Sequence, residues 1–188
     1  MSKILLVAEH DDGAIRKSTY QSLTLVRQIA ARTGASYDIA LLGQGVSGLA
    51  DGLAGYGADT VHVLDNDAYA HYLAQPWSAS VAQVIDACGA TSVVCSASTT
   101  GKDFLPRVAA IKSWGMVADC VGLAGEGADV LYNRPMYAGN IIATVKVNTP
   151  GTVISVRGSE FDAAAPAGGQ STVSAFAGDT DAVDANHG

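Results

Sequence analysis

The sequence has few charged residues and few aromatic ones, and most of its charge is negative. Charged residues make up 15% of the 188 residues and aromatic residues 6%, with 11 Lys and Arg against 18 Asp and Glu. A nucleic-acid-binding chain needs clustered positive charge to attract the phosphate backbone. The net charge of −7 argues against that class, so we predict no nucleic-acid partner.

Cysteine is scarce, and no metal-ligand spacing occurs. The three cysteines, Cys88, Cys95 and Cys120, form no CxxC pair, and each lies in an apolar segment. That pattern is typical of reduced thiols packed in a core. The four histidines show neither an HExxH motif nor a paired spacing, so we predict no metal site.

Long hydrophobic runs are missing as well. The first apolar run covers residues 4–8 and stops at Glu9 and His10. It is far shorter than the roughly 20 residues that a membrane helix needs, and no signal-peptide cleavage region follows it. We therefore expect a cytoplasmic protein with no membrane insertion.

What the chain does have is a repeated order of buried strand and amphipathic helix. Four runs have the pattern of buried strands, at residues 4–8, 37–42, 60–64 and 92–96, and the first is continuously apolar. Helical spacing of apolar residues follows the first run over about residues 18–32, and similar helices lie before and after the fourth run. This alternation predicts a three-layer α/β/α fold with a mostly parallel sheet, in which residues 4–8 form a central strand.

The alternation of strands and helices ends after the helix that contains Phe104. Strand-like runs with only short turns between them follow, at residues 120–123, 130–132, 141–147 and 152–157. They predict a meander or a short antiparallel extension at the C-terminal end of the fold. From Gly158 onward the periodicity stops, and Ala, Gly, Ser, Thr and Asp dominate. We therefore predict one α/β domain over residues 1–158 and a flexible acidic linker or tail over 159–188, disordered beyond about Ala164.

A polar loop between the fourth run and its helix is the first candidate site. Such loops lie at the carboxyl edge of a parallel sheet, where doubly wound folds bind ligands. The candidate groups for holding a phosphate or carboxylate are hydroxyls, a backbone N–H and a cation, from Thr99, Thr100, Gly101 and Lys102. The alternative is an ordinary helix start, with Asp103 as the cap and Pro106 in the first turn. The acid at Asp103 and the lack of a GxxxxGK[ST] spacing favour that alternative.

The second candidate is the loop over residues 133–140, between two apolar runs. Exposed cationic, aromatic and amide side chains in such loops are typical of recognition surfaces. Here they are Arg134, Tyr137 and Asn140, although spacing alone favours a structural hairpin loop. Glu9 and His10 form an isolated polar pair that we interpret as structural. No Ser/His/Asp, Cys/His or paired-carboxylate arrangement occurs, so we predict no catalytic residue.

These loops and their flanking segments resemble one known family in order and spacing. The matching segments are residues 6–10 (LVAEH), 99–110 (TTGKDFLPRVAA), 134–140 (RPMYAGN), 143–146 (ATVK) and 156–164 (VRGSEFDAA). Together they resemble electron-transfer flavoprotein alpha subunits, over about residues 3–170. The resemblance implies the N-terminal domain of such a subunit, with a Rossmann-like sheet similar to that of adenine-nucleotide hydrolases.

The resemblance also implies a role and partners. In that family the alpha subunit pairs with a beta subunit, and the FAD of the heterodimer takes electrons from acyl-CoA or other dehydrogenases. The FAD then passes them to a quinone reductase or another respiratory-chain acceptor. The resemblance places FAD chiefly in a C-terminal alpha domain, beyond a linker like residues 159–188, so no cofactor is expected in this chain alone. The chain is then a scaffold rather than an enzyme, with Arg134, Tyr137 and Asn140 as interface candidates.

Two other interpretations stay open on the sequence. One is a stand-alone α/β module that binds AMP or ATP through residues 98–102. The other is a piece of a flavoenzyme whose flavin contacts come from this domain. The acidic residues of 159–188 discriminate weakly between these interpretations. A linker to a further domain explains them, whereas a nucleotide-binding module does not need them.

Overall fold

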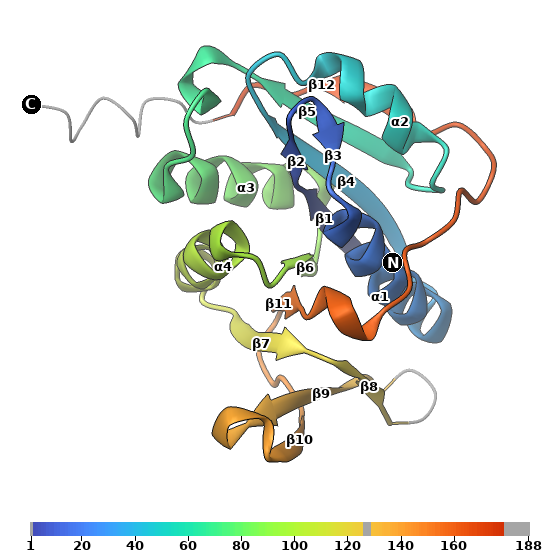
Figure 1. Ribbon diagram of the computed structural model, residues 1–188, viewed down its shortest axis with the longest axis vertical. Coiled ribbons are helices and arrows are strands. Elements are labelled where there is room, and N and C mark those ends of the chain that lie inside the picture. Colours follow the sequence, from blue (N-terminus) through green and yellow to red (C-terminus); the bar gives the residue numbers. More distant parts are fainter. Residues whose placement is uncertain (1, 126–128, 179–188) are drawn as a thin grey trace, which may run out of the picture.

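A seven-stranded parallel sheet forms the centre of the protein (Figure 1). The computed structural model describes residues 2–125 and 129–178. The strand order is β12-β5-β4-β1-β6-β11-β7, and every neighbouring pair is parallel. In chain order these strands are β1 (Lys3–Ala8), β4 (Ser36–Gly43), β5 (Thr60–Asp65), β6 (Ser92–Ser96), β7 (Gly115–Cys120), β11 (Thr152–Val156) and β12 (Thr172–Ala175).

Helices cover both faces of this sheet. The main helices are α1 (Lys17–Thr33), the short α2 (Ala50–Ala54), α3 (Ala74–Cys88) and α4 (Thr99–Lys112). Alternate residues of β1 enter different cores: Ile4 and Leu6 pack with α1 and α2, whereas Leu5 and Val7 pack with α3 and α4. The period of two along a strand thus builds two apolar layers, and the predicted three-layer α/β/α fold is confirmed.

The order of the strands places a switch point beside β1. The chain runs from β1 to β4 and β5 on one side, and then returns to β6 on the other side of β1. In open α/β sheets, ligands bind outside the carboxyl ends of the strands where the order reverses in this way. That crevice lies between the ends of β1 and β6.

Smaller elements surround the main sheet. A two-stranded ribbon of β2 (His10–Asp11) and β3 (Ala14–Ile15) follows β1, and a three-stranded antiparallel sheet joins β8 (Gly122–Ala124), β9 (Leu131–Met136) and β10 (Ile141–Val145). Single 3-10 turns occur at η1 (Ser47–Leu49), η2 (Asp67–Tyr69), η3 (Tyr137–Gly139) and η4 (Gly158–Glu160). The predicted antiparallel extension is therefore present.

The prediction that all the later strands join this extension is wrong. Residues 152–157 contain β11, which lies between β6 and β7 inside the main sheet and is parallel to both. The antiparallel sheet takes the place of a crossover helix between β7 and β11, and it returns the chain to the starting end of the main sheet. Short turns between apolar runs do not distinguish such an excursion from a simple meander.

The expected disorder beyond about Ala164 is also wrong for part of that segment. Residues 172–175 form β12, which pairs with β5 at the edge of the sheet, with Val173 opposite Val61. Hydrogen bonds to carbonyl oxygens hold the chain on its way there: Arg27 Nη1 donates to Ala165 O at 2.7 Å, and Ser171 N donates to Ala54 O at 2.9 Å. The strand is held mainly by backbone hydrogen bonds, so its composition carries no apolar signal. Residues 179–188 lie outside the described residues, and the linker role of 159–188 stays a prediction.

A cluster of charged and polar side chains, Lys3, Asp38 and His62, lies near the amino ends of β1, β4 and β5. Asp38 on β4 is 1% exposed, with Lys3 Nζ at 3.0 Å and His62 Nε2 at 2.9 Å from its two oxygens. Burial would raise the pKa of Asp38, but the hydrogen bonds from His62 and Lys3 outweigh it and hold that pKa below its usual value. Cys88 lies beside this pair. Its sulfur, a carboxylate oxygen of Asp38 and a ring nitrogen of His62 lie within 4.8 Å of one another, a spacing that could hold a metal ion. Both oxygens of Asp38 already accept hydrogen bonds, from Lys3 and His62. We therefore keep the prediction that this chain has no metal site.

The lowered pKa of Asp38 predicts a pH dependence of stability. A carboxyl group whose pKa is lower in the folded state stabilises it above about pH 4 and loses that contribution as the pH falls through the folded-state pKa. We expect Asp38→Asn to lower the free energy of unfolding at pH 7 by about 3 kcal/mol, because Lys3 loses a buried partner. Urea unfolding between pH 3 and pH 7 should show a smaller loss of stability on acidification in the variant, and an equal loss in both proteins would contradict this role.

Candidate functional site

The loop after β6 is a helix start, not an open loop. Ser98 is the N-cap of α4, and its Oγ accepts a hydrogen bond from Gly101 N at 2.9 Å. The candidates Thr99, Thr100, Gly101 and Lys102 therefore form the first helical turn. They lie at the carboxyl edge of the sheet, where the sequence placed them.

The helix begins earlier than the capping pattern indicated. Asp103 lies inside α4 and accepts a hydrogen bond from the Tyr72 hydroxyl at 2.9 Å, so the expectation that it caps the helix is wrong. Pro106 lies in the helix interior instead of the first turn. Ser98 takes the cap position because its side-chain oxygen accepts a hydrogen bond from Gly101 N, three residues later.

The carboxylate of Glu9 occupies the crevice at the switch point. Glu9 follows β1 directly and is 4% exposed. Ser98 Oγ donates to its Oε1 at 2.5 Å, and Ser96 Oγ, at the end of β6, donates to its Oε2. A longer contact of 3.4 Å joins Ser18 Oγ, in the first turn of α1, to Oε2. Hydroxyls from both sides of the crevice therefore converge on one carboxylate.

The backbone of Glu9 is fixed by Thr19 on α1. Thr19 Oγ1 accepts from Glu9 N at 2.9 Å and donates to Glu9 O at 3.1 Å, and Thr19 is 2% exposed. The N-terminal turns of α1 and α4, on opposite faces of the sheet, thus both meet Glu9. The positive ends of these helix dipoles favour a negative charge there. The interpretation of Glu9 as structural fits these contacts, but its position between two helix starts could not be seen from the sequence.

Two concavities border this carboxylate. One, of about 470 Å³, is lined by Ser18, Ser96 and Ser98 together with Lys102 and Arg157. The other, of about 300 Å³, is lined by Glu9 itself and by Arg16, Tyr72, Trp77 and Thr100 among others. The carboxylate accepts from Ser98 at the start of α4 and belongs to the lining of the second concavity.

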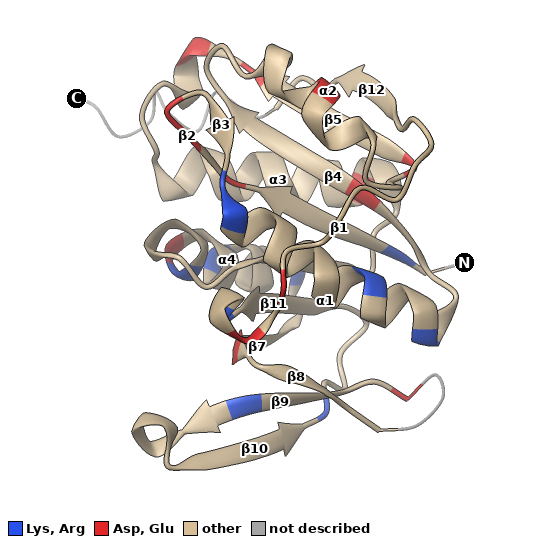
Figure 2. Cartoon of the chain, turned by 45° about the vertical axis from the view of Figure 1, so that its right-hand side comes forward, with Lys and Arg blue, Asp and Glu red and all other residues tan. Residues whose placement is uncertain are grey.

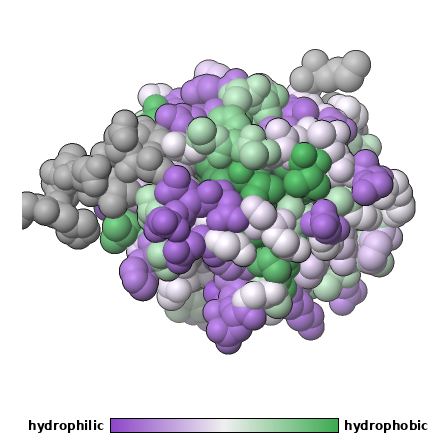
Figure 3. All heavy atoms as spheres, turned by 90° about the horizontal axis from the view of Figure 1, so that it is seen from above, coloured by the Kyte–Doolittle hydropathy of each residue, from purple (hydrophilic) through white to green (hydrophobic). Residues whose placement is uncertain are grey.

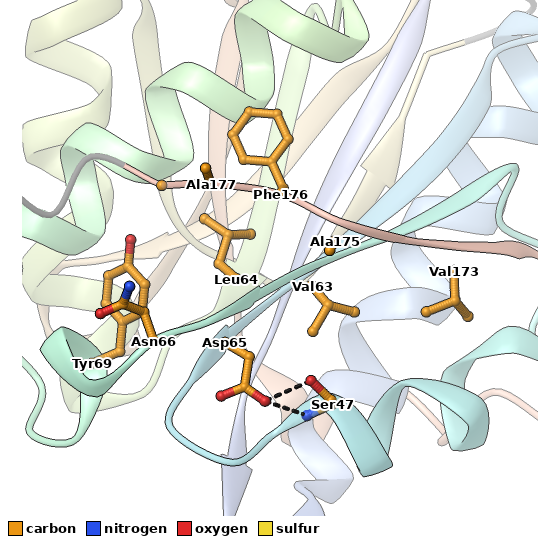
Figure 4. Close-up of a pocket in the computed structure, with 11 residues that line it drawn as sticks. Ser47, Val63, Leu64, Asp65, Asn66, Tyr69, Val173, Ala175, Phe176 and Ala177 are labelled. Carbon is orange, nitrogen blue, oxygen red and sulfur yellow. Dashed lines mark hydrogen bonds between the residues drawn. The ribbon is translucent and has the colours of Figure 1, made fainter.

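A further concavity, of about 730 Å³, lies at the edge of the sheet formed by β5 and β12 (Figure 4). Its acid, Asp65, accepts hydrogen bonds from Ser47 N at 2.9 Å, Ser47 Oγ at 2.6 Å and Gly45 N at 2.6 Å. The Ser47 hydroxyl is the largest of several effects that together lower the pKa of Asp65. Because this carboxylate already caps the turn before α2, the concavity offers a mainly apolar wall of β12 residues and few groups to orient a ligand.

The second sequence candidate is the tip of the β9–β10 hairpin. Tyr137 is 73% exposed, and Tyr137, Ala138 and Gly139 have successive positive φ angles of 51°, 55° and 89°. Asn140 Nδ2 donates to Tyr137 O at 2.9 Å, so the amide of Asn140 stabilises the turn. Arg134 on β9 has a buried Nε without a hydrogen-bond partner in the described part of the chain.

The hairpin adjoins a charged pair that sequence reasoning missed. Arg157 Nε donates to both oxygens of Asp119 at 3.1 Å, and this contact is the main cause of the lowered pKa of Asp119. Asp119 sits at an irregularity between β7 and β11, with a φ of 60°. Asp119 and Arg157 line both the concavity of about 470 Å³ with Lys102 and another of about 510 Å³ with Arg134 and Tyr137. No spacing signal marks Asp119, whereas Arg157 lies in one of the segments that resemble the family.

The hairpin also exposes apolar side chains. Met136, Tyr137, Ile141 and Ile142 are 40%, 73%, 51% and 55% exposed, and Met136 faces Ile141 across the hairpin. Figure 2 shows β9 and β10 projecting from one end of the molecule, with the basic residue of β9 in blue. The opposite end, over α2 and β12, mixes hydrophobic and hydrophilic residues on its surface (Figure 3). The exposed apolar groups and the unpaired guanidinium nitrogen therefore meet at the hairpin.

Comparison with known proteins gives the family. The model of the electron transfer flavoprotein domain matches residues 4–180. The chain belongs to the electron transfer flavoprotein family. It is 36% identical to an electron transfer flavoprotein subunit alpha of Pseudomonas aeruginosa, over 95% of this chain and 55% of that protein. It is 31% identical to subunit LctC of a lactate dehydrogenase (NAD(+),ferredoxin) of Acetobacterium woodii, over 85% of this chain and 39% of that protein.

These matches confirm the resemblance to the N-terminal domain of an electron transfer flavoprotein alpha subunit. A protein named FixB from Clostridium saccharobutylicum is 32% identical over 76% of the chain and 43% of its own length. The chain thus spans about half the length, or less, of these relatives. Within the residues that the structure describes, no helix combines the length and apolar character needed to cross a membrane.

The family implies FAD, and the switch point allows a test of fit. A phosphate-bearing cofactor would need the N–H groups and hydroxyls at the start of α4. The hydroxyls of Ser96 and Ser98 instead donate to Glu9, whose charge would repel a phosphate. The switch point therefore does not fit such a group, and this geometry argues against the candidate contact through Thr99, Thr100, Gly101 and Lys102.

Close packing at Gly101 predicts that the start of α4 is sensitive to substitution. A Cβ on Gly101 would lie 2.0 Å from Ser96 O, so the helix would have to move away from β6. We expect Gly101→Ala to lower the free energy of unfolding by about 2–3 kcal/mol, measured by urea unfolding.

Gly52 in α2 provides a matched control. A Cβ on Gly52 would meet no heavy atom within 4 Å, and the φ of this residue is not positive. Gly52→Ala should therefore be neutral or stabilising by up to about 1 kcal/mol. Equal effects of the two substitutions would show that the close approach of α4 to β6 is unimportant.

Proposed function

We propose that this chain is the partner-binding domain of an electron transfer flavoprotein alpha subunit, a scaffold without turnover of its own. It pairs with a beta subunit, and FAD is held by other parts of the heterodimer. Dehydrogenases supply electrons to that flavin, and a quinone reductase or another respiratory-chain acceptor takes them. We also propose a cytoplasmic location, which rests on the sequence.

The β9–β10 hairpin carries this proposal. Its exposed apolar side chains, Met136, Tyr137, Ile141 and Ile142, form a patch at the end of the molecule. Interfaces combine such apolar and aromatic centres with Arg, which is enriched among residues that dominate binding energy. The half-buried Arg134 lines the concavity of about 510 Å³ beside Tyr137, and a carboxylate of a partner in that concavity would pair with its charge.

The charge beside the hairpin indicates the chemistry of the partner surface. Arg157, Lys102 and Arg134 all act on Asp119, and each lowers its pKa; Glu160 is a second acid, close enough to act on Arg157. This corner is therefore locally positive on a chain whose net charge is −7. We infer that the beta subunit presents an apolar patch with a carboxylate at its rim.

In this proposal, none of the described residues takes part in redox chemistry, which the flavin supplies. The sequence shows no catalytic arrangement, and the switch point does not fit a phosphate-bearing cofactor. Some relatives are named as parts of larger enzymes, as LctC is for a lactate dehydrogenase. The role as a carrier domain rests on the alpha subunits among the relatives.

Substitutions in the hairpin should weaken assembly while leaving the domain folded. We expect Tyr137→Ala and Arg134→Ala each to weaken binding to a beta subunit of the family by about 10-fold or more, measured by calorimetric titration. Tyr137 is exposed and Arg134 belongs to the small sheet, so thermal unfolding of the isolated domain should change little.

Two substitutions on α4 serve as controls. Ile111 is an exposed apolar residue, at 55%, and Arg107 is an exposed cation on the same helix. Ile111→Ala and Arg107→Ala should leave the affinity for the beta subunit unchanged. If the hairpin variants bind as tightly as the wild type, the hairpin is not the interface.

A further inference from the structure

We propose that Glu9 is a built-in anion. Its carboxylate fills the position at the switch point where α/β folds hold phosphate groups, and it thereby closes this domain to nucleotides and other phosphate-bearing ligands. The inference concerns the sheet edge between β1 and β6 and does not depend on the hairpin interface.

The donors around Glu9 are those that bind phosphates in related folds. An anion at such a crevice is held by the N-terminus of the following helix and by hydroxyls of the adjacent loops. Here Ser98 caps α4 and donates to Oε1, Ser96 ends β6 and donates to Oε2, and Ser18 lies in the first turn of α1. The carboxylate thus takes the hydroxyl hydrogen bonds that an anion bound in this crevice would take.

The charge compensation of Glu9 differs from that of the other buried acid. Asp38, 1% exposed, has the cations Lys3 and His62 as partners. Glu9, 4% exposed, takes part in none of the salt bridges found across residues 2–125 and 129–178. Neutral hydroxyls and two helix N-termini surround it instead. That environment stabilises an anion without a counter-charge, as a phosphate cradle does.

Removal of the carboxylate would leave a vacant anion site. The concavity of about 470 Å³ already reaches Ser18, Ser96 and Ser98, and the one of about 300 Å³ reaches Glu9 itself. The close contact between Gly101 and Ser96 O keeps the start of α4 against β6, so the donors cannot spread apart easily. Without the side chain of Glu9, both serine hydroxyls lose their acceptor.

Chemical rescue tests the inference. Glu9→Ala should melt at least about 5 °C below the wild type in sodium chloride, because several hydrogen bonds are lost. Sodium formate or sodium phosphate at the same ionic strength should raise its melting temperature saturably and recover at least half of the loss. Rescue by formate alone would show that the site takes a small carboxylate, and rescue by phosphate that it takes the larger anion. Either result supports the inference.

Two variants control for general destabilisation. Glu9→Gln fills the same volume with a neutral amide, and Thr19→Val breaks the backbone contacts while keeping the carboxylate. Neither should respond to formate or phosphate more than to chloride. An equal response in all three variants would show a general salt effect and overturn the inference.

The wild type gives a test that does not depend on a variant folding. Titration of the wild type with AMP and with phosphate should give no saturable heat, and saturable binding of either one would overturn the inference. If Glu9→Ala does not fold in chloride, refolding in formate or phosphate should recover it. A variant that folds without any anion response, or that fails to fold with either anion, would also overturn the inference.

Discussion

The buried carboxylate at the end of the central strand joins the two faces of the sheet. Glu9 follows β1, and its backbone is bound by Thr19 of α1 while its side chain is bound by Ser98 at the start of α4. These two helices lie on opposite faces of the sheet. Glu9 therefore links both helix starts to β1, and its carboxylate, buried at 4% exposure, is satisfied by hydroxyl donors.

The switch point and the hairpin differ in whether their polar groups find partners and their apolar groups are covered. At the switch point, the hydroxyls of Ser96 and Ser98 find an acceptor within the chain, the carboxylate of Glu9. At the hairpin, apolar side chains stay exposed and Arg134 Nε finds no acceptor among the described residues. Small ligands commonly bind α/β folds at the first of these places, whereas our proposal assigns protein binding to the second. This contrast favours the scaffold interpretation over a nucleotide-binding module.

Local patterns in the sequence predicted the first half of the fold well. The run at residues 92–96 is β6 itself, and the helix expected over about residues 18–32 is α1. The partners of later strands depend on contacts between distant residues: β11 joins β6, and β12 joins β5 across more than a hundred residues. The same limit applies to the site. Thr99 to Lys102 were placed correctly, but the group that decides their role, Glu9, lies 89 residues from Ser98 and looked like an isolated acid.

Hydrogen exchange of backbone amides, with and without a beta subunit of the family, tests the central claim most directly. The account predicts slower exchange in the complex over β9, β10 and the turn between them, residues 131–145. It predicts unchanged exchange over residues 96–103 at the switch point, where the donors already have an acceptor. Protection confined to residues 96–103, with the hairpin unchanged, would contradict it.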